Sequence, residues 1–317
     1  MRFLSIIILV AAAISGIEAK PLKVATLHPL LADLSREVGG DRVEVVELVG
    51  PNDNPHDFEP TPKQIHSVAG SQLCLASGMG LENYLDTLRE LLPEKTQLIE
   101  LGADLPSIEG GACEICEHGH KDHDDHKGHD HDNHKGHNHD DHAGHDHAID
   151  PHWWHSIDTF RRAVSLTAEH FAKAHPEGAA TYRANAATYR ARLDQLEKWT
   201  KREIAKIPRD RRILATAHAA FGYFCHDFGF EAISVQGMNR EQMPDPATLA
   251  KLIKTLRDRD VPAIFPEKAS NPKILQALTA DTGIRLADPL HADGTQVKSY
   301  ESMIRENVTH IVAALAE

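Results

Sequence analysis

The stretch LKVATLHPLLADLSREVGGDRVEVVELV, residues 22–49, indicates how this chain folds. Residues 22–27 and 43–49 are rich in β-branched and other apolar side chains and are predicted to be strands, whereas 31–39 carries a helical pattern. A strand, a helix and a second strand in this order favour a parallel sheet, because the helix carries the chain back to the starting edge. The stretch therefore predicts an α/β fold.

The same alternation continues on both sides of a long polar segment. Further strands are expected at 72–77, 96–101, 212–216, 231–235, 262–267 and 284–288, and helices at 61–70, 81–91, 156–174, 217–229, 245–258, 271–283 and 299–317. A very long helix is expected at 176–207, and its apolar face is formed by Tyr182, Ala186, Tyr189, Leu193 and Leu196. Thr61 and Asp245, each followed by proline, are predicted helix N-caps.

These elements predict two β/α lobes with parallel-type sheets joined by a long connecting helix. The expected boundaries are 20–174 for the N-terminal lobe, 175–208 for the connecting helix and 209–317 for the C-terminal lobe. Two such lobes enclose a cleft, and open parallel sheets bind ligands at the carboxyl ends of their strands. A helical connection is stiffer than loop crossovers, so we expect only modest closure of the lobes.

The N-terminal residues and the charge indicate where the protein works. Residues 1–19 combine Arg2, a short apolar run and a small residue, which predicts a signal peptide cleaved after Ala19. With no cysteine near that position we expect no lipid anchor, and the mature chain is expected to be a periplasmic monomer without stable membrane insertion. The net charge of −13 argues against nucleic acid as a partner.

Residues 103–149 lack apolar periodicity and are expected to form a flexible loop rich in His and Asp. Its twelve histidines are His118, His120, His123, His126, His129, His131, His134, His137, His139, His142, His145 and His147. Such a tract binds Zn²⁺, but its many equivalent ligand sets specify no single geometry, so several weaker, exchangeable ions are expected. The alternative is a solvated linker with incidental affinity.

The four cysteines divide into two pairs. Cys113 and Cys116 form a CxxC just before the tract, and they either extend the metal-binding segment or close a small disulfide loop. Cys74 and Cys225 are expected to be buried free thiols.

Metal-capable side chains follow several of the predicted strands. His56, His218 and Asp288 come shortly after strands, and His152 lies where the chain leaves the polar segment. Taken singly, each histidine could be an ordinary loop residue, and Asp288 before proline could be a turn former. Their joint placement at the cleft favours a metal site. His28, at the end of the first strand, is a further candidate ligand or supporting donor.

Three motifs give this chain a family resemblance along nearly its whole mature length. VGPNDNPHDFEPTP (49–62), DPHWWHS (150–156) and TAHAAFGYF (216–224) resemble motifs of the metal-specific solute-binding proteins of bacterial ABC importers, the cluster A-I family. The resemblance implies metal ligands at His56, His152 and His218, with Asp288 in the fourth ligand position, and an ABC permease as partner. Where that family usually continues with Leu-Asp-Pro after this Trp pair, the chain has His155, Ser156 and Ile157, so His155 is either idle or assists.

The expected donor set favours zinc. Three imidazoles and one carboxylate suit tetrahedral Zn²⁺, whereas Mn²⁺ favours more oxygen ligands, and copper would also accept imidazoles. The predicted function is therefore capture of periplasmic zinc for an ABC permease, with the tract assisting acquisition and a zinc metallochaperone as a further candidate partner. A zinc buffer or metallochaperone using the tract as its main site is the alternative.

The same residues could also form the active site of a zinc hydrolase. It would use Asp288 outside the metal shell and Glu59 or Glu267 as base. The sequence contains neither HExxH nor G-x-S-x-G, and we expect no enzyme.

Overall fold

Two four-stranded parallel sheets form the centres of two lobes. The computed structural model describes residues 20–50, 53–68, 70–110, 149–238, 245–268 and 273–316. The N-terminal sheet has the order β2-β1-β3-β4, and its strands are β1 (Leu22–Thr26), β2 (Val43–Glu47), β3 (Leu73–Ala76) and β4 (Gln97–Glu100). The C-terminal sheet has the order β6-β5-β7-β8, and its strands are β5 (Ile213–Thr216), β6 (Glu231–Ser234), β7 (Ala263–Phe265) and β8 (Arg285–Leu286).

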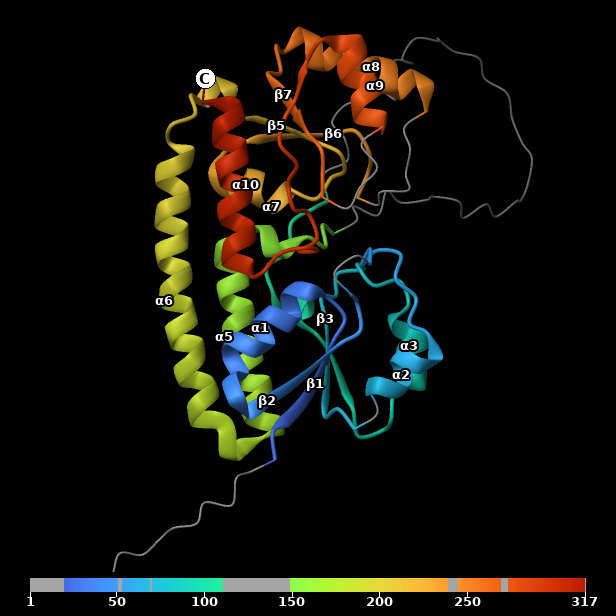
Figure 1. Ribbon diagram of the computed structural model, residues 1–317, viewed down its shortest axis with the longest axis vertical. Helices are drawn as coiled ribbons and strands as arrows, with labels where there is room; N and C mark the ends of the chain where they lie inside the picture. The colour runs from blue at the N-terminus through green and yellow to red at the C-terminus, as the bar shows by residue number, and fades with distance from the viewer. Residues whose placement is uncertain are drawn as a thin grey trace, which may run out of the picture.

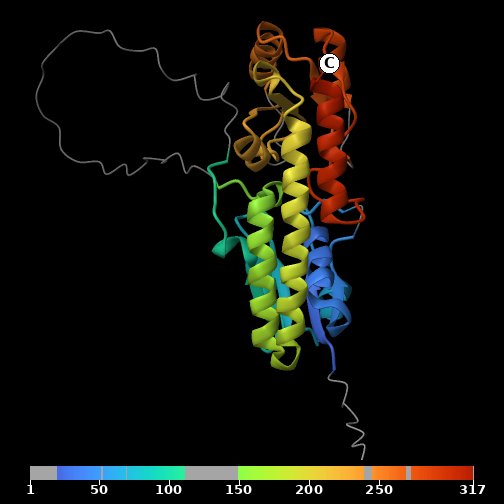
Figure 2. The ribbon, with the colours of Figure 1, turned by 90° about the vertical axis from the view of Figure 1, so that its left-hand side faces the viewer.

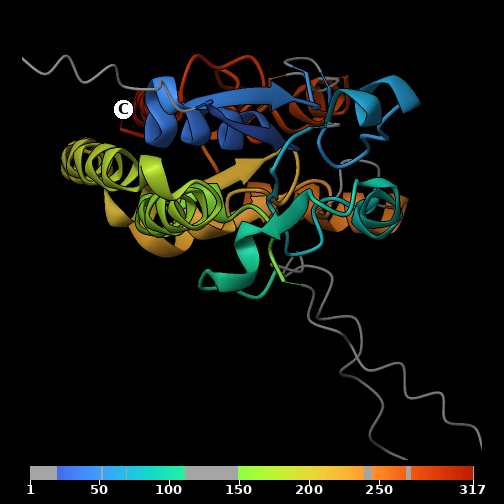
Figure 3. The ribbon, with the colours of Figure 1, turned by 90° about the horizontal axis from the view of Figure 1, so that it is seen from below.

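Helices cover both faces of the N-terminal sheet, because alternate residues of its strands point to opposite sides. Leu73 and Leu75 of β3 belong to the core that faces α1 (Pro29–Gly39), while Cys74 and Ala76 pack on the other face with side chains of α2 and α3. Helix α2 spans Pro62–Val68 and α3 spans Leu85–Leu91. Figure 3 shows α2 and α3 on the side of this lobe opposite the long helices.

Two helices begin at the predicted N-caps, whereas the helix expected from residue 217 begins only at Gly222. Asp245 caps α8 (Pro246–Asp258) by accepting hydrogen bonds from the backbone N–H groups of Ala247 and Thr248. In the first lobe Thr61 caps α2 by accepting a hydrogen bond from the N–H of Gln64. The other helices that the structure describes in the C-terminal lobe are α7 (Gly222–Phe228), α9 (Lys273–Thr282) and α10 (Tyr300–Leu315).

Long helices join the lobes along one side of the molecule. Helix α5 (Ile157–Ala174) runs beside the N-terminal lobe, and the 26-residue α6 (Ala179–Ile204) extends from there along the C-terminal lobe (Figures 1 and 2). Helix α10 returns beside α6, and the ring of Tyr300 at its start stacks on Phe160 of α5 with centroids 3.5 Å apart. One continuous apolar core therefore contains side chains from both lobes.

Short 3₁₀ turns complete the described chain: η1 (Gly40–Arg42), η2 (Leu101–Asp104), η4 (Trp153–His155), η5 (Pro176–Gly178) and η6 (Arg209–Arg211). The helix expected to open at Pro176 thus starts with a 3₁₀ turn before α6.

The expected fold class of two β/α lobes with a helical connection is confirmed. Cys74 and Cys225 are buried free thiols, as expected. Among the described residues, no helix combines the length and apolar character needed to cross a bilayer. Residues 1–19, the His/Asp tract and the pair Cys113–Cys116 lie outside the described residues.

Candidate metal centre

His218 is held at the carboxyl end of β5 by a buried carboxylate. It lies two residues beyond Thr216, the last residue of the strand. Glu267, which follows β7, accepts hydrogen bonds from the backbone N–H of His218 (2.8 Å) and from its Nδ1 (2.6 Å). A carboxylate oxygen paired with Nδ1 accepts a hydrogen bond from it, so the hydrogen of the neutral ring lies on Nδ1 and Nε2 offers its lone pair as a ligand.

His152 is oriented in the same way by Asp150. Both the backbone N–H and Nδ1 of His152 donate to Asp150 Oδ1, at 2.9 and 2.8 Å. The ring is fully buried, and burial lowers the pKa of His152 against the opposing effect of the Asp150 hydrogen bond. Gly222, in the first turn of α7, lets the chain pass close to this carboxylate, because a Cβ there would lie 2.4 Å from Asp150 Oδ2. A neutral His152 thus presents Nε2 to His56 and Asp293.

Two loops supply the other members of the cluster. His56 lies in the loop between β2 and α2, and its backbone N–H donates to Asn54 Oδ1 at 3.2 Å. Asp293 lies in the loop between β8 and α10. Two residues earlier, the backbone of His291 is held by the side chain of Asn307, which accepts the N–H of His291 at 2.8 Å and donates to its carbonyl at 2.9 Å. Gly294, at φ +66°, turns the chain immediately after Asp293.

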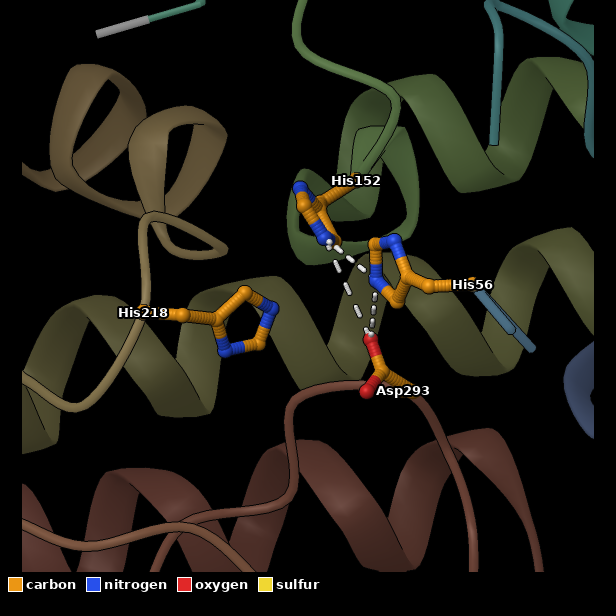
Figure 4. Close-up of side chains that lie close together, drawn as sticks. All are labelled: His56, His152, His218 and Asp293. Carbon is orange, nitrogen blue, oxygen red and sulfur yellow. Dashed lines mark hydrogen bonds and ion pairs between the residues drawn. The ribbon is translucent and has the colours of Figure 1, made fainter. Parts of the chain in front are cut away.

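Figure 4 shows these four side chains converging from four different segments. Nε2 of His152 lies 3.2 Å from Nε2 of His56, and Asp293 Oδ1 lies 3.4 Å from His56 Nε2 and 3.9 Å from His152 Nε2. One ligand atom from each of His56, His152, His218 and Asp293 falls within 4.8 Å of the others, and all four residues are buried. The site is assembled from both lobes.

The size and chemistry of the cluster fit one small divalent cation. Zinc–ligand bonds of about 2.0–2.1 Å in a tetrahedron place neighbouring donor atoms roughly 3.3 Å apart, close to the 3.2–3.9 Å that separate the donor atoms of His56, His152 and Asp293. Asp150, Glu267 and Asp293 surround the three histidines with acidic groups. Burying such groups together is costly without a compensating positive charge. The arrangement can therefore bind a metal ion through three imidazole nitrogens and one carboxylate.

The fourth member corrects the expectation for Asp288. Asp288 is exposed and does not belong to the cluster, whose carboxylate is Asp293, five residues further along the chain. The reason is that backbone pairing continues past β8: Leu290 donates its N–H to the carbonyl of Pro266, and Lys268 donates to the carbonyl of Leu290. The chain thus turns toward the histidine cluster only after Leu290.

The other histidine candidates lie around the cluster rather than in it. His28 uses Nδ1 to accept the backbone N–H of Leu30 at the start of α1, and its ring packs on Trp154 with centroids 4.4 Å apart. Burial lowers the pKa of His28 to about 3. His155 is fully buried, and its Nε2 lies 2.7 Å from the carbonyl oxygen of Ala292. Neither is brought into the ligand set.

The sequence reasoning missed three contributions. Asp293 was signalled by the Asp-Gly turn dipeptide of HADGT (291–295), which follows a strand and marks a sharp change of chain direction. Asp150 stands two residues before His152 in the quoted motif, a spacing that suits a carboxylate oriented toward the ring. The role of Glu267 in orienting His218 had no local signal, because 49 residues separate the two.

Comparison with known proteins places this arrangement in context. Residues 24–314 match the family described as zinc-uptake complex component A, periplasmic. The manganese-binding lipoprotein MntA of Bacillus subtilis is 28% identical over 304 residues, covering 93% of this chain and 90% of the relative. The zinc-binding protein TroA of Treponema pallidum is 25% identical over 309 residues, covering 94% and 90%. A solved structure of periplasmic zinc-binding TroA from that organism superposes with a TM-score of 0.78 at 24% identity, covering 94% of this chain and all of the other.

Proposed function

The chain belongs to the family of periplasmic zinc-uptake components, and from this premise we propose that it captures Zn²⁺ in the periplasm for an ABC-importer permease. The family comprises solute-binding proteins of ABC transporters, which are not enzymes. The ligands we propose are His56, His152, His218 and Asp293, with Asp293 in place of Asp288.

The observation that supports zinc is the donor set. Three imidazole nitrogens and one carboxylate oxygen that lie within 4.8 Å of one another suit a tetrahedral Zn²⁺ ion. Manganese takes more oxygen ligands, and its preferred shell is octahedral. Some relatives are named for manganese and others for zinc, so the choice of metal is tested directly.

The test is a competition titration of residues 20–317 with zinc and with manganese. We expect one tight zinc equivalent that manganese cannot displace, and loss of that equivalent in His56→Ala, His152→Ala and His218→Ala. Tighter binding of manganese than of zinc would reject the zinc assignment. Wild-type zinc affinity in two of the three variants would reject the ligand assignment.

We propose that the His/Asp tract holds further zinc ions more weakly and speeds loading of the buried site. Deleting residues 117–147 should remove the weak equivalents, slow loading at scarce zinc and leave one tight equivalent. A zinc buffer whose main site is the tract would instead lose nearly all its zinc. We also propose that the protein is a monomer and receives zinc from a periplasmic metallochaperone. The molar mass of residues 20–317 in solution and zinc transfer to them from such a protein test the two proposals.

A further inference from the structure

The turn that follows His152 also contacts the loop that carries Asp293. Nε1 of Trp154 donates to the carbonyl oxygen of Ala292 at 2.7 Å. Nε2 of His155 lies at the same distance from the same oxygen, and since a carbonyl only accepts, His155 donates too. Ala292 is the residue immediately before Asp293, so both hydrogen bonds fix the peptide group that leads into this carboxylate.

Both donor rings are rigidly packed. Trp154 is 1% exposed and His155 is completely buried. Trp154 lies against the ring of His28, with centroids 4.4 Å apart, and His155 lies against Phe221 at 4.3 Å. A ring confined on its faces can move its N–H group little, so the two donors define one position for the Ala292 carbonyl.

The carbonyl also connects different parts of the candidate site. Trp154 and His155 lie in η4, directly after His152, whereas Ala292 belongs to the loop of the second lobe that α10 anchors through Asn307. The pair therefore links the segment of one proposed ligand, His152, to the segment of another, Asp293.

We propose that His155, acting with Trp154, is a positioning residue that holds Asp293 at the metal and thereby slows metal release. This inference rests on the proposed metal-binding function, and it assigns to a non-ligand histidine a part in setting how long the ion stays bound.

The test compares zinc release to an excess of chelator from His155→Leu, His155→Gln and Trp154→Phe. His155→Leu removes the donor and keeps an apolar side chain of moderate size, His155→Gln retains an N–H donor, and Trp154→Phe keeps a ring without the N–H. Loss of one neutral hydrogen bond corresponds to release about threefold to tenfold faster, since 1.4 kcal/mol is tenfold. We expect this acceleration in His155→Leu and Trp154→Phe, with partial or full rescue in His155→Gln.

His310→Leu is the matched control. Nδ1 of His310 bonds to the carbonyl of Pro289 at 2.9 Å, so this variant removes a histidine–carbonyl hydrogen bond from the same connecting segment, three residues before Ala292. It should release zinc at the wild-type rate. The visible spectrum of bound Co²⁺ gives a second readout, because a displaced Asp293 changes its coordination in His155→Leu but not in His310→Leu.

The outcomes separate this inference from the proposed function. If the wild-type protein binds no tight zinc, the proposed function itself is wrong. If it does, and His155→Leu shows wild-type release and an unchanged Co²⁺ spectrum, the positioning role is wrong. Equal acceleration in His155→Leu, His155→Gln and His310→Leu would also overturn it, because the effect would then follow packing rather than the donor.

Discussion

Replacing Glu267 by glutamine should weaken metal binding without removing a proposed ligand. Glu267 accepts two hydrogen bonds from His218, one from the backbone N–H and one from Nδ1. Glutamine offers one oxygen and one NH₂ group, so it can accept only one of the two. If its oxygen faces Nδ1, the NH₂ group opposes the backbone N–H of His218. If its NH₂ group faces Nδ1, the ring must carry its hydrogen on Nε2, the nitrogen needed for the metal.

The second arrangement satisfies both groups but places a hydrogen on Nε2, so binding zinc forces the first arrangement, which leaves the buried backbone N–H of His218 unsatisfied at a cost of about 1–3 kcal/mol. At 1.4 kcal/mol per tenfold, zinc affinity should fall roughly 5- to 150-fold. Mutation of a group that orients a metal ligand typically lowers metal affinity about 10- to 100-fold, which lies within this range. Competition against a zinc chelator measures the dissociation constant, and thermal melting in chelator verifies the metal-free fold.

Glu177→Gln is the control for this prediction. Glu177 pairs with Nε2 of His175 at 3.3 Å, at the turn between α5 and α6. It is therefore a carboxylate–histidine pair outside the candidate metal centre, and its loss should leave zinc affinity unchanged. A dissociation constant for Glu267→Gln within twofold of the wild-type value would show that the orientation of His218 does not depend on this carboxylate.

Three further predictions concern the Asp293 loop and the buried histidines. Asp293→Ala should abolish tight zinc binding in a chelator competition, whereas Asp288→Ala should bind as the wild type does, because Asp288 is exposed outside the cluster. Gly294→Ala should lower the free energy of unfolding by about 1–3 kcal/mol in a denaturant titration, since a Cβ at φ +66° would lie 2.4 Å from Leu30 Cγ. The metal-free protein should melt at lower temperature as the pH falls from 7 to 5. Burial lowers the pKa of His28 to about 3 and of His155 to about 4 in the folded protein, whereas histidines of the unfolded chain have a pKa near 6.5. Between pH 7 and 5 the unfolded chain therefore binds more protons than the folded protein, which lowers the free energy of unfolding. A melting temperature independent of pH over this range would contradict that last expectation.

The sequence predicted the fold well because its signals are local. Strands and helices alternate with short connections, and caps such as Asp245 before Pro246 specify where helices begin. The placement of His56 and His218 in the cluster followed from the same alternation. Each follows a strand, β2 or β5, and so lies at the carboxyl edge of its own sheet, where open parallel sheets bind ligands.

The fourth side chain could not be placed in this way. The position of Asp293 depends on strand pairing that continues to Leu290, and this pairing is set by the partner segment around Pro266 rather than by residues near Asp288. His28 shows the opposite failure. It stands at a strand end as expected, but the local demand for a helix cap takes up its Nδ1. Register and capping competition are therefore what the local pattern left undetermined.

The apolar core shared by both lobes has a consequence for how the protein denatures. Many proteins built from two sheet-centred halves can lose one half while the other stays intact. Here α6 runs along both halves, and Phe160 and Tyr300 stack across their boundary, so neither half can unravel without exposing the interior of the other. Unfolding should accordingly be a single cooperative transition. An ion bound between the lobes would then raise the midpoint for the whole described chain rather than for one part of it.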